Sequence, residues 1–316
     1  MKIENAVETS STNGGGRAGS GQPGGRPDWL PLEEFPFTSR YLEIDGHLIH
    51  YVDEGEGPLL LLVHAGMWSF LWRDLIVRLR EDFRCVALDF PGAGLSKPAE
   101  GFHPGLDAAS RVLESFVRTL DFRDITLIVH DLGGPVAIAM AARLRDRIRA
   151  IALIESFGWS LSEENPKVAR MLRLAGGRTF GLVNGATNLL MRITSTSFGA
   201  GRHLSGNGRR ALRGPYRDRP ARRQTTAMLR DAALADDYLR GVDHALRTVL
   251  SDRPILLVFG EKSPAIKEGF PERWRARFPD ALLLLVADGH HFPMMDDPDL
   301  VAGALRSWWS DEARAA

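Results

Sequence analysis

The sequence predicts an α/β fold with a mostly parallel central sheet, helices on both faces and an inserted helical cap. Between residues 41 and 154, short apolar runs rich in β-branched side chains alternate with segments of helical periodicity. The same alternation resumes at residue 255. The intervening residues 157–246 carry helical and loop patterns without a convincing buried strand. We therefore interpret them as an insertion that covers the ligand-binding edge of the sheet.

Size and composition are those of a globular protein with a substantial core. The chain has 316 residues, 44% of them hydrophobic, and a formal net charge of zero. A neutral chain gives no reason to expect nucleic acid or an anionic membrane as a partner, and its apolar runs have the length of strands, not of membrane spans. The single cysteine, Cys85, lies in an apolar run and is expected to be a buried thiol. We expect a reducing compartment, the cytoplasm.

Residues 1–28 are rich in Gly, Ser, Asn and Thr. We expect a disordered tail there, because such a segment buries too little apolar surface to offset its ordering entropy. The predicted core covers residues 29–156 and 247–316, and the predicted cap covers residues 157–246. The core begins with a hairpin whose turn is Asp45-Gly46. Further strands are expected at 59–63, 84–88, 125–129, 150–154, 255–259 and 281–286, and core helices at 70–80, 107–120, 134–144 and 297–309.

Arginines crowd the second half of the predicted cap, between Arg202 and Arg223. Such a stretch either binds an anionic partner or forms a solvated face whose charges pair with nearby acids. The neutral total charge favours the solvated face.

A sharp strand-turn-helix motif lies near the middle of the predicted core. The buried strand Ile125–Val129 leads into the turn His130–Gly134, and a helix of small residues follows. This pattern is typical of a nucleophile elbow, in which the reactive side chain lies at the tip of a strained turn. The residue at the tip is Asp131, and no G-x-S-x-G occurs in the chain. The alternative is that Asp131 only caps the following helix.

Several further segments, in a shared order, carry a resemblance to a known family. These are Tyr41–Gly46 with His50–Asp53, Leu71–Leu75, Asp89–Ser96, His130–Gly134 and His291–Pro298. From about Pro36 onward the chain resembles the α/β-hydrolase fold, within it the haloalkane dehalogenase and epoxide hydrolase branch that uses an aspartate nucleophile. The resemblance implies that Asp131 attacks carbon and forms a covalent ester, and that a histidine then activates water.

Two adjacent histidines compete for the role of base. The family places its base directly before an aromatic residue and a few residues before an Asp-Pro pair, and His291 matches this pattern better than His290. In many relatives the acid that orients the base follows the strand at 255–259, at a position that is Ser263 here. Serine holds no negative charge, so we expect Glu155, at the end of the strand after the elbow helix, to replace it. Glu261 is the alternative acid.

The leaving-group site departs from the family pattern. The resemblance implies backbone N–H donors from Leu132 and Gly66, but dehalogenases commonly add an indole N–H directly after the nucleophile and an Asn side chain in the loop. Neither Leu132 nor Gly66 has a side-chain donor. Trp68 is a candidate substitute donor, or else a packing residue under the cap. The cap tyrosines, Tyr216 and Tyr238, offer the acids that epoxide hydrolases use, although Tyr216 resembles a structural cap residue.

The sequence thus predicts a hydrolase for small apolar electrophiles, similar to haloalkane dehalogenases, with the catalytic residues Asp131, His291 and Glu155. An epoxide or lactone hydrolase with the same triad is the alternative, and a non-catalytic ligand-binding or signalling protein is the second. We expect a small-molecule substrate and no cofactor or metal. The oligomeric state stays open.

Overall fold

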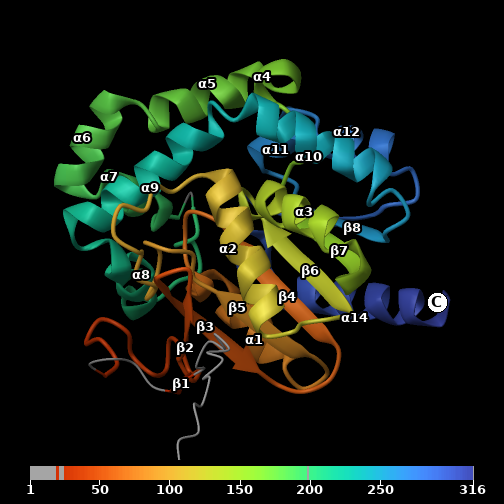
Figure 1. Cartoon of the computed structure of the whole chain (residues 1–316), viewed down its shortest axis with the longest axis horizontal. Helices are drawn as coiled ribbons and strands as arrows, with labels where there is room; N and C mark the ends of the chain where they lie inside the picture. Colours follow the sequence, from red (N-terminus) through yellow and green to blue (C-terminus); the bar gives the residue numbers. More distant parts are fainter. Residues whose placement is uncertain (1–18, 21–24, 198, 316) are drawn as a thin grey trace, which may run out of the picture.

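The computed structural model describes residues 19–20, 25–197 and 199–315. Within this part of the chain, nine strands form one sheet in the order β1-β2-β3-β5-β4-β6-β7-β8-β9 (Figure 1). The strands β2 and β3 are antiparallel to their neighbours, whereas the six strands from β5 to β9 in this order run parallel. The predicted α/β architecture with a mostly parallel sheet is therefore confirmed.

Apart from β1, which lies in the segment predicted to be a disordered tail, the strands lie where the sequence predicted them. Their bounds are Gly19–Ser20 for β1, Arg40–Ile44 for β2, His47–Glu54 for β3, Leu59–His64 for β4, Arg84–Leu88 for β5, Ile125–His130 for β6, Ile148–Ile154 for β7, Ile255–Gly260 for β8 and Leu282–Val286 for β9. The end strand β9 leaves Leu282 and Leu285 exposed. Their exposure follows from the position of β9 at the edge of the sheet.

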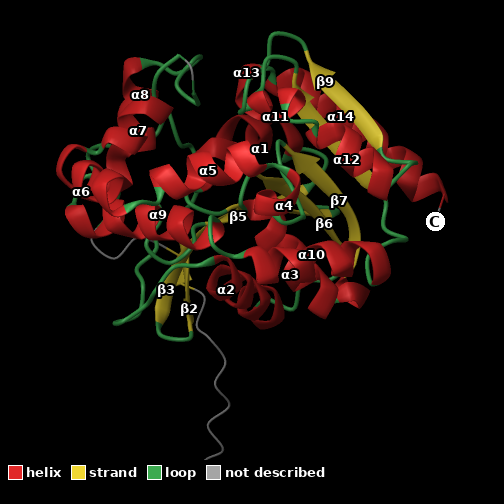
Figure 2. Ribbon diagram, turned by 90° about the horizontal axis from the view of Figure 1, so that it is seen from above, coloured by secondary structure: helices red, strands yellow, loops and turns green. Residues whose placement is uncertain are grey.

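The two faces of the sheet bury two separate apolar clusters. Alternate residues of β4 point to opposite sides, as the strand geometry requires, so that Leu61 and Val63 join one cluster and Leu60 and Leu62 join the other. Figure 2 shows α2 (Leu106–Thr119), α3 (Gly133–Arg143) and α10 (Asp236–Thr248) on one side of the strands. The helices α1 (Arg73–Leu79) and α14 (Pro298–Ala315) lie on the other side.

Most of the insertion between β7 and β8 lies above the sheet in Figure 1. Its elements are α4 (Leu161–Glu164), α5 (Pro166–Ala175), α6 (Arg178–Thr187), α7 (Leu189–Thr194), α8 (Gly206–Arg213), η3 (Gly214–Tyr216), α9 (Arg219–Ala232) and α10. The last of these, α10, packs against α3 of the core, although it lies within the predicted cap. The division of the chain into core and cap stays a prediction.

Short helices complete the core near the ends of the strands. They are η1 (Ser69–Trp72), η2 (Arg145–Arg147), α11 (Pro264–Lys267), α12 (Phe270–Arg277) and α13 (Pro293–Asp296). The predicted tail falls mostly outside the described residues. Within its described part, Gly19–Ser20 pairs with β2, and the guanidinium of Arg26 donates to the carbonyl oxygens of Phe35 and Phe37 at 2.9 and 3.1 Å.

Candidate active site

Asp131 lies at the tip of a tight turn between β6 and α3. Its φ of 49° is in the left-handed region, which non-glycine residues rarely adopt. The turn requires glycine at position 133, because a Cβ on Gly133 would lie 2.2 Å from the carbonyl oxygen of Val63. The carbonyl of Asp131 accepts hydrogen bonds from Gly134 N at 3.0 Å and from Ser156 Oγ at 2.8 Å. These contacts hold the backbone in the strained conformation and leave the carboxylate at the carboxyl edge of the sheet.

The carboxylate of Asp131 faces the imidazole of His291, so the alternative that Asp131 only caps α3 is wrong. The N-cap residue of α3 is Leu132. The distance from Asp131 Oδ2 to His291 Nε2 is 3.7 Å, and the distance from His291 Nδ1 to Glu155 Oε2 is 3.5 Å. Asp131 and His291 are about one-third exposed, whereas the Glu155 side chain is fully buried. The three side chains lie in the order carboxylate, imidazole, carboxylate, which is the arrangement that a nucleophile, a base and an orienting acid require.

Glu155 follows β7 and, like Asp131, has a left-handed backbone, with φ 47°. Its Oε1 accepts a hydrogen bond from Gly260 N at 2.7 Å, and its Oε2 accepts one from the hydroxyl of Ser263. Ser263 is fully buried. Ser263, at the position where the sequence analysis expected no acid, thus donates to the carboxylate of Glu155. Glu261, the alternative acid, is exposed.

The other histidine of the doublet, His290, faces away from Asp131. Its Nδ1 lies 2.9 Å from the guanidinium of Arg202 in the insertion, and its backbone N–H donates to Asp296 Oδ2 at 2.7 Å. Arg202 also donates to the carbonyl of Asp288 at 2.7 Å. These contacts fix the loop that carries both histidines. Because the His290 ring is bonded to Arg202, His291 is the histidine of the pair that contacts Asp131.

The backbone donors at Leu132 and Gly66 are available, but Trp68 is not. Among the described residues, none accepts a hydrogen bond from the N–H of Leu132 or of Gly66. Gly66 has φ 101°, and a Cβ built on it meets open space. The indole N–H of Trp68 donates to the carbonyl of Leu212 at 3.2 Å, and its ring is buried. The prediction of Trp68 as a leaving-group donor is therefore not supported, because its N–H is already bonded to the insertion.

Both cap tyrosines direct their hydroxyls to backbone carbonyls. The Tyr216 hydroxyl donates to Gly66 O at 3.4 Å, and the Tyr238 hydroxyl donates to Pro135 O at 3.1 Å and to Leu106 O at 3.4 Å. Burial raises the pKa of both phenols. Each tyrosine thus joins the insertion to the core, which is a structural role.

Two further histidines at the site were missed by the sequence reasoning. His64 ends β4 and His130 ends β6, and the two residues are paired in the sheet register. Their rings stack with centroids 5.0 Å apart, and the His130 ring lies 4.8 Å from that of His291. His130 Nε2 donates to the carbonyl of His291 at 2.7 Å. Histidines at the same end of two neighbouring parallel strands were the signal that could have revealed them.

The pKa values of the site follow from burial and charge. Burial lowers the pKa of His291, but the carboxylates of Asp131 and Glu155 outweigh it and raise this pKa to about 10. Burial raises the pKa of Asp131, but His291 outweighs it and lowers this pKa to about 2. Burial lowers the pKa of His64 to about 4 and that of His130 well below its ordinary value. At neutral pH the site therefore holds an Asp131–His291 ion pair beside two neutral imidazoles.

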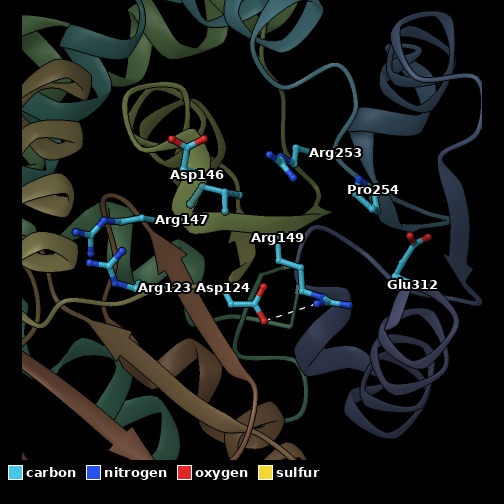
Figure 3. Close-up of a pocket in the computed structure, with 9 residues that line it drawn as sticks. Arg123, Asp124, Asp146, Arg147, Arg149, Arg253, Pro254 and Glu312 are labelled. Carbon is cyan, nitrogen blue, oxygen red and sulfur yellow. Dashed lines mark ion pairs between the residues drawn. The ribbon is translucent and has the colours of Figure 1, made fainter. Parts of the chain in front are cut away.

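A hollow of about 600 Å³ lies at the opposite edge of the sheet (Figure 3). Its lining residues Asp124, Arg147 and Pro254 directly precede β6, β7 and β8, whereas Asp131 and Glu155 follow the carboxyl ends of β6 and β7. This hollow is thus separate from the candidate active site. Within the described chain, no cluster of three or more His, Cys, Asp or Glu side chains could hold a metal ion, and no helix has the length and apolar character to cross a membrane.

Comparisons with known proteins identify the family of the chain. The α/β hydrolase fold family matches residues 58–298. The chain is 33% identical to haloalkane dehalogenase 2 of Mycobacterium bovis over 281 residues, which cover 86% of this chain and 94% of that protein. It is 27% identical to the cis-3-alkyl-4-alkyloxetan-2-one decarboxylase of Shewanella oneidensis, over 87% of this chain and 89% of that protein.

Among solved structures, the fold resembles that of the haloalkane dehalogenase DatA from Agrobacterium tumefaciens C58. The TM-score is 0.75 at 22% sequence identity, and the match covers 87% of this chain and 96% of that chain. At this identity the likeness concerns the fold. Together with the sequence matches and the aspartate at the elbow, it shows that the chain belongs to the α/β-hydrolase family, in its haloalkane dehalogenase branch.

Proposed function

We propose that this protein is a hydrolase that acts on small apolar electrophiles through a covalent ester on Asp131. The observation that carries the proposal is the arrangement of Asp131, His291 and Glu155, with 3.7 Å between the first two side chains and 3.5 Å between the last two. Its leading form is dehalogenation of a haloalkane, as the name of the mycobacterial relative suggests. We propose no cofactor, because a carboxylate and an imidazole supply the nucleophile and the base.

In the first step the Asp131 carboxylate attacks an electrophilic carbon of the substrate. A C–O bond forms, the bond from carbon to the leaving group breaks, and the leaving group departs with the bonding electron pair. The pKa of about 2 keeps Asp131 ionised and ready to attack at neutral pH. The product of this step is an alkyl ester of Asp131.

In the second step His291 activates a water molecule. Once Asp131 is an ester it has no charge, so one of the two carboxylates that raise the pKa of His291 is lost. His291 then loses its proton to solvent, and the neutral ring takes a proton from water while the oxygen of that water attacks the carboxyl carbon of Asp131. In this proposal the N–H groups of Leu132 and Gly66 stabilise the oxyanion that forms. Glu155 stabilises the imidazolium, which returns its proton to the departing alcohol.

Opening of an epoxide or lactone ring is the second candidate. Its supporting observation is that the indole N–H of Trp68 and the hydroxyls of Tyr216 and Tyr238, the side-chain donors that the sequence offered, already donate to backbone carbonyls, whereas the backbone amides of Leu132 and Gly66 are available. Two backbone amides suit an oxygen anion, as in other acyl-transfer sites. A relative named for an oxetan-2-one, a four-membered lactone, also supports this candidate.

The test is to trap the ester in the variant His291→Phe, which keeps the nucleophile but lacks the base. The variant is mixed separately with 1-bromobutane, with an alkyl epoxide and with a β-lactone, and its intact mass is measured. We expect the mass of a butyl group in place of one hydrogen with 1-bromobutane, and the mass of the whole molecule with the epoxide or the lactone, because ring opening expels nothing. The adduct should lie on a peptide that contains Asp131. Asp131→Asn is the matched control and should give no adduct.

The released product then separates the candidates. Bromide release by the wild-type enzyme supports dehalogenation, whereas ring-opened product without activity on bromoalkanes supports the second candidate. Binding of these compounds without any adduct or turnover would instead support the non-catalytic protein and reject the covalent mechanism.

A further inference from the structure

A second hollow, of about 310 Å³, lies within the insertion and is lined by arginines. The residues around it are Ala186, Thr187, Asn188, Arg192, Arg210, Arg213, Arg217 and Arg222. They belong to α6, α7, α8 and α9 and to the segments that join α6 to α7 and η3 to α9. The five arginines come from α7, α8 and α9 and from the segment after η3, and all five line the same hollow.

These five arginines have no acidic partners. Within the described residues, no carboxylate forms an ion pair with any of them. The sequence reasoning favoured a solvated face between Arg202 and Arg223 whose charges pair with nearby acids; Arg210 and Arg217 are exposed as expected, but the expected pairing does not occur for the arginines that line the hollow, within the described residues. The hollow at the sheet edge differs, because acidic residues lie among its arginines (Figure 3): Asp124, Asp146 and Glu312. One of them, Asp124, has its Oδ2 3.6 Å from Arg149.

Arg222 lines the hollow with a side chain that hydrogen bonds hold in place. Its guanidinium donates to the carbonyl oxygens of Tyr216 at 2.8 Å and of Gly185 at 3.1 Å. It thus ties α9 to η3 and α6. Arg192, Arg210 and Arg217 are exposed at the rim, and Arg213 forms one hydrogen bond, from its Nε to the carbonyl of Arg209 in the same helix. Their remaining N–H donors are available to a ligand.

We propose that this hollow is a binding site for a phosphate group. Five like charges around one space repel one another, and a multiply charged anion removes this repulsion. Guanidinium groups match the geometry of phosphate oxygens, since each offers two parallel N–H donors. The site lies in the insertion, on residues that the proposed reaction does not use, so it is independent of the proposed function.

Exposed apolar side chains beside the hollow indicate what kind of molecule carries the phosphate group. Leu182 and Val183 are 78% and 43% exposed, and they precede the lining residues Ala186 and Thr187 by one turn of α6 on the same side of the helix. Apolar side chains beside a phosphate site fit a phosphate ester with a hydrocarbon part. Such a group comes either from a free phosphate ester or from the headgroup of a phospholipid, and the experiment separates these sources.

The experiment compares the full chain with its Arg210→Gln/Arg213→Gln variant. Calorimetry measures the affinity for inorganic phosphate and for hexyl phosphate at constant ionic strength, with chloride as the reference anion. Sedimentation measures binding to phosphatidylcholine vesicles with and without phosphatidic acid. We expect binding of phosphate-bearing ligands to weaken by about tenfold or more in the variant, because each lost guanidinium removes charge-assisted hydrogen bonds.

The matched control is Arg123→Gln/Arg253→Gln, which removes two arginines from the hollow of Figure 3. It should bind phosphate as the wild type does. Binding of the soluble phosphates identifies a free ester as the source, and binding of phosphatidic acid vesicles alone identifies a headgroup. Absence of both, equal weakening in the two double variants, or equal competition by chloride would overturn the proposal.

Discussion

The buried carboxylate beside His291 belongs to Glu155, and two donors hold it in place. Gly260 N donates to Oε1 and the Ser263 hydroxyl donates to Oε2. Both donors belong to β8 and the turn that follows it. The carboxylate at the end of β7 is thus held beside the imidazole by contacts with the neighbouring strand.

A carboxylate at position 263 should restore part of the kcat that is lost when Glu155 is neutralised. We expect Glu155→Gln to lower kcat by about a hundredfold or more, because the imidazolium loses its stabilising charge. Adding Ser263→Asp should recover at least about tenfold, since the Ser263 side chain already touches that of Glu155. The control is Glu155→Gln/Ser263→Asn, which has the shape of the second variant without the charge. Equal kcat values for the Asp and Asn forms would contradict this role.

His291 should show two pKa values, one in the resting enzyme and a lower one during turnover. NMR of the resting enzyme should show its ring titrating near pH 10. The acid limb of the kcat profile should lie at least one pH unit lower, because ester formation removes the charge of Asp131. Asp131→Asn imitates the neutral ester and should also lower the NMR value. The same midpoint in all three measurements would exclude this coupling.

The raised pKa of His291 also has a consequence for stability. The folded-state value lies above the ordinary value of 6.5. Its contribution to stability is therefore complete below about pH 6.5 and is lost as the pH rises through 10.

Sequence motifs were sufficient to propose Asp131, His291 and Glu155, because each directly follows a strand or lies in the loop after the last one. They were not sufficient to assign Trp68. Its loop position allowed a donor role, but its N–H is bonded to Leu212, which lies 144 residues away in the chain. Hydrogen bonds between distant segments are not encoded in local spacing.

At the level of elements, the loop after β4 joins the site to the insertion. Trp68 packs between Trp29, Phe35 and Phe70, with ring centroids 5.4–5.8 Å apart. Asp89, after β5, fixes the start of η1 by accepting a hydrogen bond from Ser69 N at 2.7 Å. Asp89 also accepts from Leu95 N at 2.9 Å and pairs with His50 at 2.8 Å. This buried network holds the backbone that presents Gly66.

The variant Trp68→Phe tests whether this tryptophan has a structural or a chemical role. Phenylalanine keeps an aromatic ring but loses the hydrogen bond to Leu212, so we expect the free energy of unfolding to fall by about 1 kcal/mol. Because the indole N–H points to the insertion, kcat/KM should stay within about twofold. Urea denaturation and steady-state kinetics measure the two quantities. A loss of tenfold or more in kcat/KM at unchanged stability would restore Trp68 as a leaving-group donor.

The predicted elements agree best where periodicity is strong and sequence neighbours set the structure. The core strands and α2, α3 and α14 lie within a few residues of their expected positions. The helix α12 was missed, since only Phe270, Pro271 and Trp274 of its eight residues are buried and the rest of it is charged or small. Its apolar stripe is too narrow to stand out before its partners, Trp159 and Phe278, are known.

For the molecule as a whole, one apolar cluster crosses the boundary between core and insertion. It joins Leu30 and Phe35 near the start of the described chain, Trp68 and Leu75 of the core, and Leu212 of the insertion. The hydroxyls of Tyr216 and Tyr238 add hydrogen bonds across the same boundary. The insertion is thus held by buried contacts along its length.

We expect core and insertion to unfold in one cooperative transition. The shared cluster means that separating the insertion would expose buried aromatic rings of the core, which is costly. Urea titration followed by tryptophan fluorescence, by far-ultraviolet circular dichroism and by residual activity should give coincident curves. Loss of activity at a clearly lower urea concentration than the loss of helix signal would show that the insertion opens separately.

The sequence by itself determined the order of strands and helices, the elbow with Asp131 at its tip, and the pair of candidate bases. Periodicity and turn chemistry act between near neighbours, so they can be read along the chain. Only the tertiary structure decided which histidine faces Asp131, how Ser263 supports Glu155, and which arginines share one hollow. These features depend on contacts between segments that lie far apart in the chain, and folding alone brings such segments together.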